Sequence, residues 1–127
     1  MEYLKLKNME NKEFSKRLEK RTKAFAIGII KLSINLPNSV EGKVIRNQLT
    51  KSGTSIGANY REANRARSKA DFKNKIKISE SETNETCYWL EIIEDLKWTE
   101  HQLLESILTE ANELLAIFTS IGKNLQL

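Results

Sequence analysis

Apolar residues recur every three, four or seven positions along most of the chain, which is the period of an amphipathic α-helix and not of a strand. Short polar or helix-breaking segments divide this pattern into four runs. The runs predict helices at about 11–35, 41–66, 69–97 and 100–122. Because short connections make consecutive helices antiparallel neighbours, we expect an all-α fold, an antiparallel up-down-up-down four-helix bundle.

Local signals predict where these helices begin and end. Pro37 disfavours helical backbone in the residue before it and should end the first helix. Ser68, with an acidic residue three positions later, is typical of an N-cap for the third helix. By the same reasoning, Thr99 is expected to cap the start of the fourth helix, and Gly122 to cap its end.

The ends of the chain and its single cysteine indicate how the chain is divided and where the protein is located. We expect residues 1–10 to form a flexible N-terminal arm and residues 11–127 to form the bundle. Charge interrupts the N-terminus throughout, and no run reaches the ~18 apolar residues of a membrane span, so neither a signal peptide nor membrane association is expected. One cysteine excludes an internal disulfide and fits a reducing compartment, which predicts a cytoplasmic location.

The stretch SGTSIGANY, residues 52–60, is rich in poor helix formers, yet the apolar period continues through it. Gly53 and Gly57 are four residues apart and therefore share one helix face. We interpret them as a place where another helix approaches closely, either within the subunit or between subunits. A phosphate-cradling loop is the weaker alternative, because neither common glycine-rich phosphate motif is present.

Residues that support catalysis or metal binding are few. His101 is the only histidine, so the chain offers neither a His-based metal cluster nor the Glu-x-x-His pairs of di-iron bundles. Glu82 and Glu85 could contact a cation, but solvated or ion-paired carboxylates are the simpler interpretation. Cys87 falls on the apolar stripe and is expected to be a buried thiol. The sequence therefore predicts a non-enzyme without metal or cofactor.

Charge is distributed unevenly along the chain. Residues 12–23 hold six bases and two acids, and residues 61–77 hold seven bases and two acids, whereas residues 78–113 hold ten acids and one base. In an up-down-up-down bundle both basic segments lie at one end, here called the basic end. The candidate phosphate-binding residues there are Arg61, Arg65, Arg67, Lys69, Lys73, Lys75 and Lys77.

Two interpretations of the basic end compete. Its lysines can pair with glutamates of neighbouring helices, or they can bind an anionic partner such as RNA or DNA. No ladder of aromatic residues for stacking bases is evident, so we expect contacts to the nucleic-acid backbone. The alternative function is that of a protein-assembly scaffold, or an accessory subunit with no direct nucleic-acid contact.

The segment from Lys51 to Ile93 resembles the 23S rRNA intervening-sequence proteins, a bacterial family of four-helix bundles, and the resemblance covers nearly the whole chain. The residues that carry it are Ser55-Ile56-x-x-Asn59, Arg61-Glu62-Ala63, Asp71-Phe72 and Glu85-Thr86-x-Tyr88-Trp89-Leu90-Glu91. The resemblance implies no catalytic residues. It also relates the chain to the accessory variability protein of diversity-generating retroelements, a basic barrel that works with a reverse transcriptase and nucleic acid.

The resemblance further implies a ring-like homo-oligomer, most often a homopentamer. Tyr88 and Trp89 cannot both face the core, so this aromatic pair is a candidate subunit interface, with peripheral core packing as the alternative. Gly53 and Gly57 are the other interface candidates. The acidic stretch 78–113 departs from more basic relatives.

Overall fold

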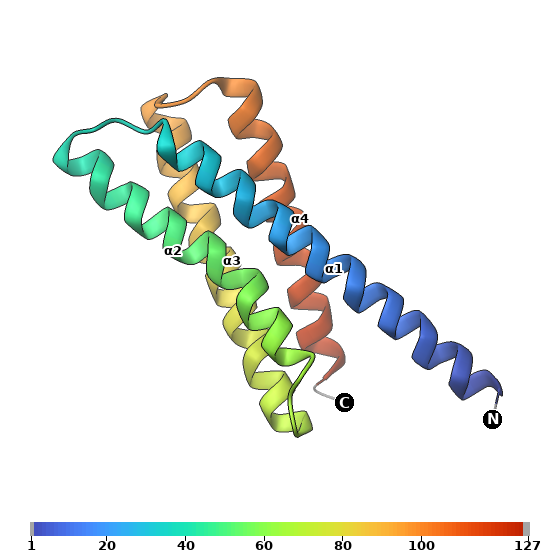
Figure 1. Cartoon of the computed structure of the whole chain (residues 1–127). Coiled ribbons are helices and arrows are strands. Elements are labelled where there is room, and N and C mark those ends of the chain that lie inside the picture. Colours follow the sequence, from blue (N-terminus) through green and yellow to red (C-terminus); the bar gives the residue numbers. More distant parts are fainter. Residues whose placement is uncertain (1, 126–127) are drawn as a thin grey trace.

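The computed structural model describes the backbone of residues 2–125 and the side chains of residues 11–125. Its helices are α1 (Glu2–Ile34), α2 (Val40–Ala63), α3 (Lys69–Leu96) and α4 (His101–Asn124), and no strand occurs in the described residues. Consecutive helices run in opposite directions (Figure 1), which confirms the all-α up-down-up-down bundle. No helix in the described part of the chain is long and apolar enough to cross a membrane.

Helix α1 begins earlier than expected. We expected residues 1–10 to form an arm, but the helix includes Glu2 and everything up to Ile34. The physical reason is that residues 2–10 contain neither glycine nor proline, so nothing in them stops a helix. Met1 lies outside the described residues, and the flexibility of this segment stays a prediction.

Serine side chains cap two of the helices. The Asp71 N–H donates to the Ser68 Oγ at 3.0 Å, as expected at the start of α3. Ser39 accepts the Gly42 N–H at 3.0 Å and caps α2 in the same way. Each side-chain oxygen satisfies one of the backbone donors that a helix start leaves without a partner.

Both predicted capping residues of α4 are wrong, although the helix bounds agree to within two residues. Glu100, and not Thr99, occupies the N-cap position, and it makes no side-chain cap bond. The Thr99 hydroxyl is instead buried and has no partner among the described residues. Gly122 lies inside α4, which continues to Asn124, because its backbone stays helical and a glycine stops a helix only where a left-handed turn follows.

Helix α3 ends on a left-handed residue that is not glycine. Lys97 has φ 55° and ψ 42°. Its N–H donates to the Glu94 carbonyl at 3.1 Å, and the Trp98 N–H donates to the Ile93 carbonyl at 3.2 Å. These two bonds form a Schellman motif, which terminates the helix and turns the chain toward α4.

The core lies between all four helices and is mainly aliphatic. Near its basic end, Tyr60 of α2 and Phe118 of α4 pack edge to face with ring centroids 5.6 Å apart. The largest fully buried aliphatic side chains are Ile29, Leu32, Leu49, Ile56, Ile76, Leu90, Ile93, Leu104 and Leu114. Their spacing follows the periodic stripes that predicted the helices.

A seam of buried small polar side chains joins α2 to α3. The Ser79 hydroxyl of α3 donates to the Ile56 carbonyl of α2 at 3.0 Å. The Thr86 hydroxyl of α3 and the Ser52 hydroxyl of α2 lie 2.9 Å apart in a hydrogen bond. Because these groups are partnered, their burial allows the two helices to approach closely without leaving orphaned polar atoms.

The glycines of the SGTSIGANY stretch face α1 of the same chain. A Cβ at Gly53 would lie 2.9 Å from the Ile29 side chain, and one at Gly57 would lie 2.8 Å from the Thr22 hydroxyl. The close approach that we expected is therefore present, and it occurs within the subunit. The two glycines therefore serve the contact of α2 with α1 of the same chain.

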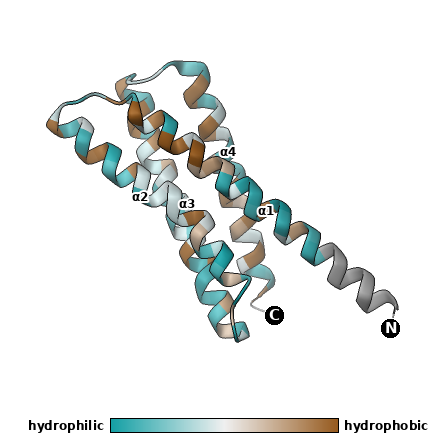
Figure 2. Ribbon diagram, viewed as in Figure 1, coloured by the Kyte–Doolittle hydropathy of each residue, from teal (hydrophilic) through white to brown (hydrophobic). Residues whose placement is uncertain are grey.

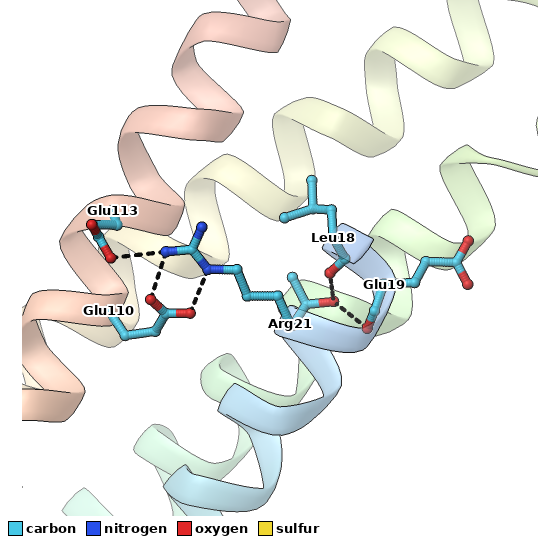
Figure 3. Close-up of polar contacts among 6 residues, drawn as sticks. Leu18, Glu19, Arg21, Glu110 and Glu113 are labelled. Atoms are coloured by element: carbon cyan, nitrogen blue, oxygen red, sulfur yellow. Dashed lines mark hydrogen bonds and ion pairs between the residues drawn. The ribbon is translucent and has the colours of Figure 1, made fainter. Parts of the chain in front are cut away.

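A forked ion pair connects α1 to α4, whose contact is otherwise the sparsest between neighbouring helices. The Arg21 guanidinium donates twice to the Glu110 carboxylate, at 2.7 Å each, and once to Glu113 at 2.8 Å (Figure 3). This hydrogen bonding holds the pKa of Glu110 below its usual value. The Glu19 side chain points away from Arg21, toward α2 (Figure 3).

Candidate nucleic-acid interface

The structure brings the basic segments of α1, α2 and α3 to one end of the bundle. The connection between α2 and α3 lies at the same end as the last turns of α4 (Figure 1). Contacts from Glu19 to Arg61 and Asn64 hold the basic segment of α1 beside the end of α2. The basic segment of α1 and the basic end of α2 are thus in contact, and α3 begins at the same end of the bundle.

Arg61 is the predicted residue that lies closest to the bases of α1. Its Nε lies 3.6 Å from the Glu19 carboxylate, which also accepts a hydrogen bond of 2.9 Å from the Asn64 side-chain amide. A shallow groove of about 340 Å³ opens beside this pair. Its basic lining residues are Lys16, Arg17, Lys20, Lys23 and Arg61.

Lys75 is the second predicted base with a partner inside the chain. Its Nζ lies 2.9 Å from the Glu62 carboxylate of α2. The hydrogen bond to Glu62 raises the pKa of Lys75 above its usual value. Lys75 therefore contributes to the α2–α3 contact and is the least available of the candidates for an external anion.

The other five candidates make no ion pair with any residue in the described part of the chain. Arg65 and Arg67 are exposed on the connection between α2 and α3. Lys69, Lys73 and Lys77 are spaced four residues apart, so they share one face of the first three turns of α3. These five residues are available to bind an anion: Arg65, Arg67, Lys69, Lys73 and Lys77.

Our candidate set did not include the lysines of α1. Lys16, Lys20 and Lys23 are exposed and line the groove beside Arg61. Their spacing of four and three residues, which places them on one helix face, is the signal that could have identified them.

The aromatic pair of α3 divides between the surface and the core. Tyr88 is 57% exposed, whereas Trp89 is partly buried and packs against the core. Their rings meet edge to face with centroids 5.1 Å apart. The Trp89 indole N–H is shielded from solvent and has no partner among the described residues.

The residues considered for catalysis or metal binding lie apart from the basic end. The Cys87 thiol is buried beside the Asn112 side-chain oxygen at 3.7 Å, and burial raises its pKa. His101 is exposed and lies 3.2 Å from Glu105. Within the described residues, no three His, Cys, Asp or Glu side chains lie close enough to share a metal ion.

Glu82 and Glu85 lie side by side on α3. Partial burial, followed by the nearby charge of Glu85, raises the pKa of Glu82. Neither carboxylate makes an ion pair in the described part of the chain.

Comparisons with known proteins agree with this fold. The sequence family described as 23S rRNA-intervening sequence protein matches residues 15–120. A crystal structure of a protein of unknown function from the S23 ribosomal protein family of Bacteroides thetaiotaomicron VPI-5482 is 40% identical, with a TM-score of 0.76. The similarity covers 83% of this chain and 97% of that protein. No curated protein is detectably similar to the chain.

Proposed function

This chain belongs to the 23S rRNA-intervening sequence protein family, and we propose that it is a non-catalytic, homo-oligomeric bundle whose basic end binds the phosphate backbone of RNA or DNA. The observation that carries the proposal is the group of five bases on the α2–α3 connection and the start of α3 that have no ion-pair partner among the described side chains. Within residues 11–125, ion pairing accounts for Arg61 and Lys75 of the predicted set. The remaining charge is left to attract an anion.

The chemistry of the basic end favours contact with the backbone over readout of bases. Arginine and lysine side chains bind phosphate irrespective of sequence. Phe72, next to Lys73, is partly buried and packs against the core. Tyr60 is 2% exposed and packs against Phe118, so neither ring is free to stack on a base. We therefore expect binding with little base preference and strong salt dependence.

A triple substitution tests the proposal. Fluorescence anisotropy at low salt is expected to show binding of labelled single-stranded and duplex RNA and DNA by the wild-type chain. Arg65→Gln/Arg67→Gln/Lys69→Gln should weaken that binding by at least about tenfold, since three phosphate contacts are removed at once.

The matched control removes the same amount of charge from the opposite end of the bundle. Lys31, Lys43 and Lys97 are exposed bases distant from the α2–α3 connection, and Lys31→Gln/Lys43→Gln/Lys97→Gln should retain most of the affinity. Equal losses of affinity in the two triple variants would show that binding depends on net charge and not on the basic end. No binding of any nucleic acid, together with co-purification of a protein such as a reverse transcriptase, would favour the alternative role as an assembly scaffold.

A further inference from the structure

Helix α1 has a second apolar stripe on the side away from the core. Ile27, Ile30 and Ile34 follow a spacing of three and four residues and are 45%, 41% and 67% exposed. The core residues of α1 lie on the opposite side of the helix wheel. Lys20 and Lys23 lie on this same side of the helix, and no acid occurs from Lys20 to Ile34. The outer face of α1 is thus apolar with a basic rim, and Figure 2 shows how hydrophobic this half of the helix is.

Helix α3 has an outer stripe of the opposite charge. Ile92 and Leu96 lie on its side away from the core, with Tyr88 beside them. Trp89 lies at the edge of this side, partly exposed and partly packed against the core. Leu96 is 50% exposed, and Trp89 and Ile92 are partly exposed. Glu82 and Glu85 lie on this same side, and no base occurs from Ile78 to Leu96. The outer face of α3 is therefore apolar with an acidic rim.

The two stripes match position by position in the same chain direction. Each begins with two charged residues three apart, continues with an apolar residue four positions later, and ends with two more at spacings of three and four. The corresponding residues, in order, are Lys20, Lys23, Ile27, Ile30 and Ile34 of α1, and Glu82, Glu85, Trp89, Ile92 and Leu96 of α3. Alternating spacings of three and four are those of helices that pack in register along a shared seam.

The fold presents these two faces so that copies can be joined in a series. Helices α1 and α3 both touch α2 and α4 but make no contact with each other in the described part of the chain, so they occupy opposite corners of the bundle. They also run in the same direction. Copies placed side by side in one orientation would bring α1 of one beside α3 of the next, parallel and in register.

We propose that the chain assembles head to tail, with the outer face of α1 in one copy packed in parallel against the outer face of α3 in the next copy. The partner is a second copy because the two faces are complementary. Both are apolar at the centre, and the bases beside one face match the acids beside the other. Such a heterologous contact generates a ring when the rotation between copies closes. This inference rests on the oligomeric part of the proposed function and not on nucleic-acid binding.

This pairing gives the basic residues of α1 and those of the α2–α3 connection different partners. Lys20 and Lys23 face Glu82 and Glu85 of the neighbouring copy, two carboxylates without an ion-pair partner in the described chain. The bases on the α2–α3 connection lie beyond this contact and stay free for phosphate. Because all copies point the same way, their basic ends gather on one side of the assembly.

Two single substitutions test the interface by sedimentation velocity. Wild-type chain is expected to form an assembly larger than a dimer at micromolar concentration. Ile30→Glu on the α1 face and Leu96→Lys on the α3 face should each raise the concentration needed for assembly by at least about tenfold, because an ionised side chain would be buried against apolar surface. Val44→Glu, at a 53% exposed position outside both faces, is the matched control and should leave assembly unchanged.

Mixing the two variants distinguishes this contact from a symmetric one. Ile30→Glu retains an intact α3 face and Leu96→Lys retains an intact α1 face, so an equimolar mixture should form heterodimers and nothing larger. Self-dimerisation of either variant at the wild-type concentration would indicate an isologous contact and overturn the proposal, as would a monomeric wild-type chain.

Charge reversal guards against loss of folding. Lys23→Glu and Glu85→Lys should each weaken assembly, and the double variant should restore it, which misfolded chains would not do. Absence of this rescue contradicts the register. Monomeric Ile30→Glu should still bind nucleic acid, because its basic end is intact. The experiment therefore distinguishes a failure of the interface proposal from a failure of the phosphate-binding proposal.

Discussion

At the scale of single residues, glycines in helices have opposite effects that depend on their neighbours. Gly53→Ala should lower the free energy of unfolding by about 1–3 kcal/mol, because the new Cβ would lie 2.9 Å from the Ile29 side chain. Gly28→Ala is the matched change, since no atom lies within 4 Å of its Cβ position. It should raise the free energy of unfolding by about 0.5–1 kcal/mol. Urea unfolding measures both, and equal effects would contradict the tight α1–α2 contact.

The end of α3 offers a second change at a single residue. Lys97 is held at φ 55°, a conformation that is costly for any residue with a Cβ. Lys97→Gly should therefore stabilise the protein by about 1 kcal/mol in thermal or urea unfolding. Lys97→Ala keeps the Cβ and removes the charge, so it is the control and should give no such gain. A destabilised Lys97→Gly variant would contradict the left-handed end of the helix.

At the scale of helices, the contact of α1 with α4 should depend on pH. The Arg21 guanidinium lowers the pKa of Glu110 in the folded chain below the ordinary value of 4.5. The stabilisation is therefore fully present above pH 4.5 and is lost as the pH falls through the lower folded pKa.

Glu110→Gln should show the same dependence as a difference between two unfolding curves. At neutral pH the variant should be less stable than wild type by about 1 kcal/mol, the upper range for a partly exposed pair. The gap should close as the pH falls below 4.5 and through the lower pKa of the folded chain. Glu91→Gln, at an exposed carboxylate of α3 without an ion pair among the described residues, should show no comparable gap. A gap that is constant across this range would contradict the ion pair.

The helices themselves could be predicted from sequence, but their pairing contacts could not. Periodic apolar residues determine which segments are helical and which face is buried, because burial of that face supplies most of a helix's stability. Thr99 shows the limit, since its motif matched a capping box although the chain enters α4 one residue later. Arg21 and Glu110 are 89 residues apart, and their contact depends on how α1 and α4 are rotated against each other.

The candidate site follows the same division. Topology alone brought the basic segments to one end, so Arg65, Arg67 and Lys69 could be chosen from sequence. That Lys75 is paired with Glu62, and that lysines of α1 line the groove beside Arg61, depends on the positions of side chains on separate helices. For the same reason, the sequence did not show whether the helix that approaches Gly53 comes from the same subunit or from another.

At the scale of the whole molecule, the uneven charge and the two outer faces belong to one arrangement. Parallel head-to-tail assembly would place every basic end on the same side and every acidic stretch toward the other. A nucleic acid that spans several copies would then gain affinity from simultaneous contacts with no new contact in any one copy. The effective affinity should consequently fall when Ile30→Glu dissociates the assembly, although the basic end of each chain is intact.

The most direct test of phosphate binding by the basic end is the salt dependence of the affinity for duplex DNA. For the wild-type chain, a plot of log affinity against log salt concentration should fall steeply. In Arg65→Gln/Arg67→Gln/Lys69→Gln the slope should be shallower by about 2–3, since each lost phosphate contact removes roughly 0.9 from it. A flat wild-type plot, or a slope unchanged from that of Lys31→Gln/Lys43→Gln/Lys97→Gln, would contradict the proposal.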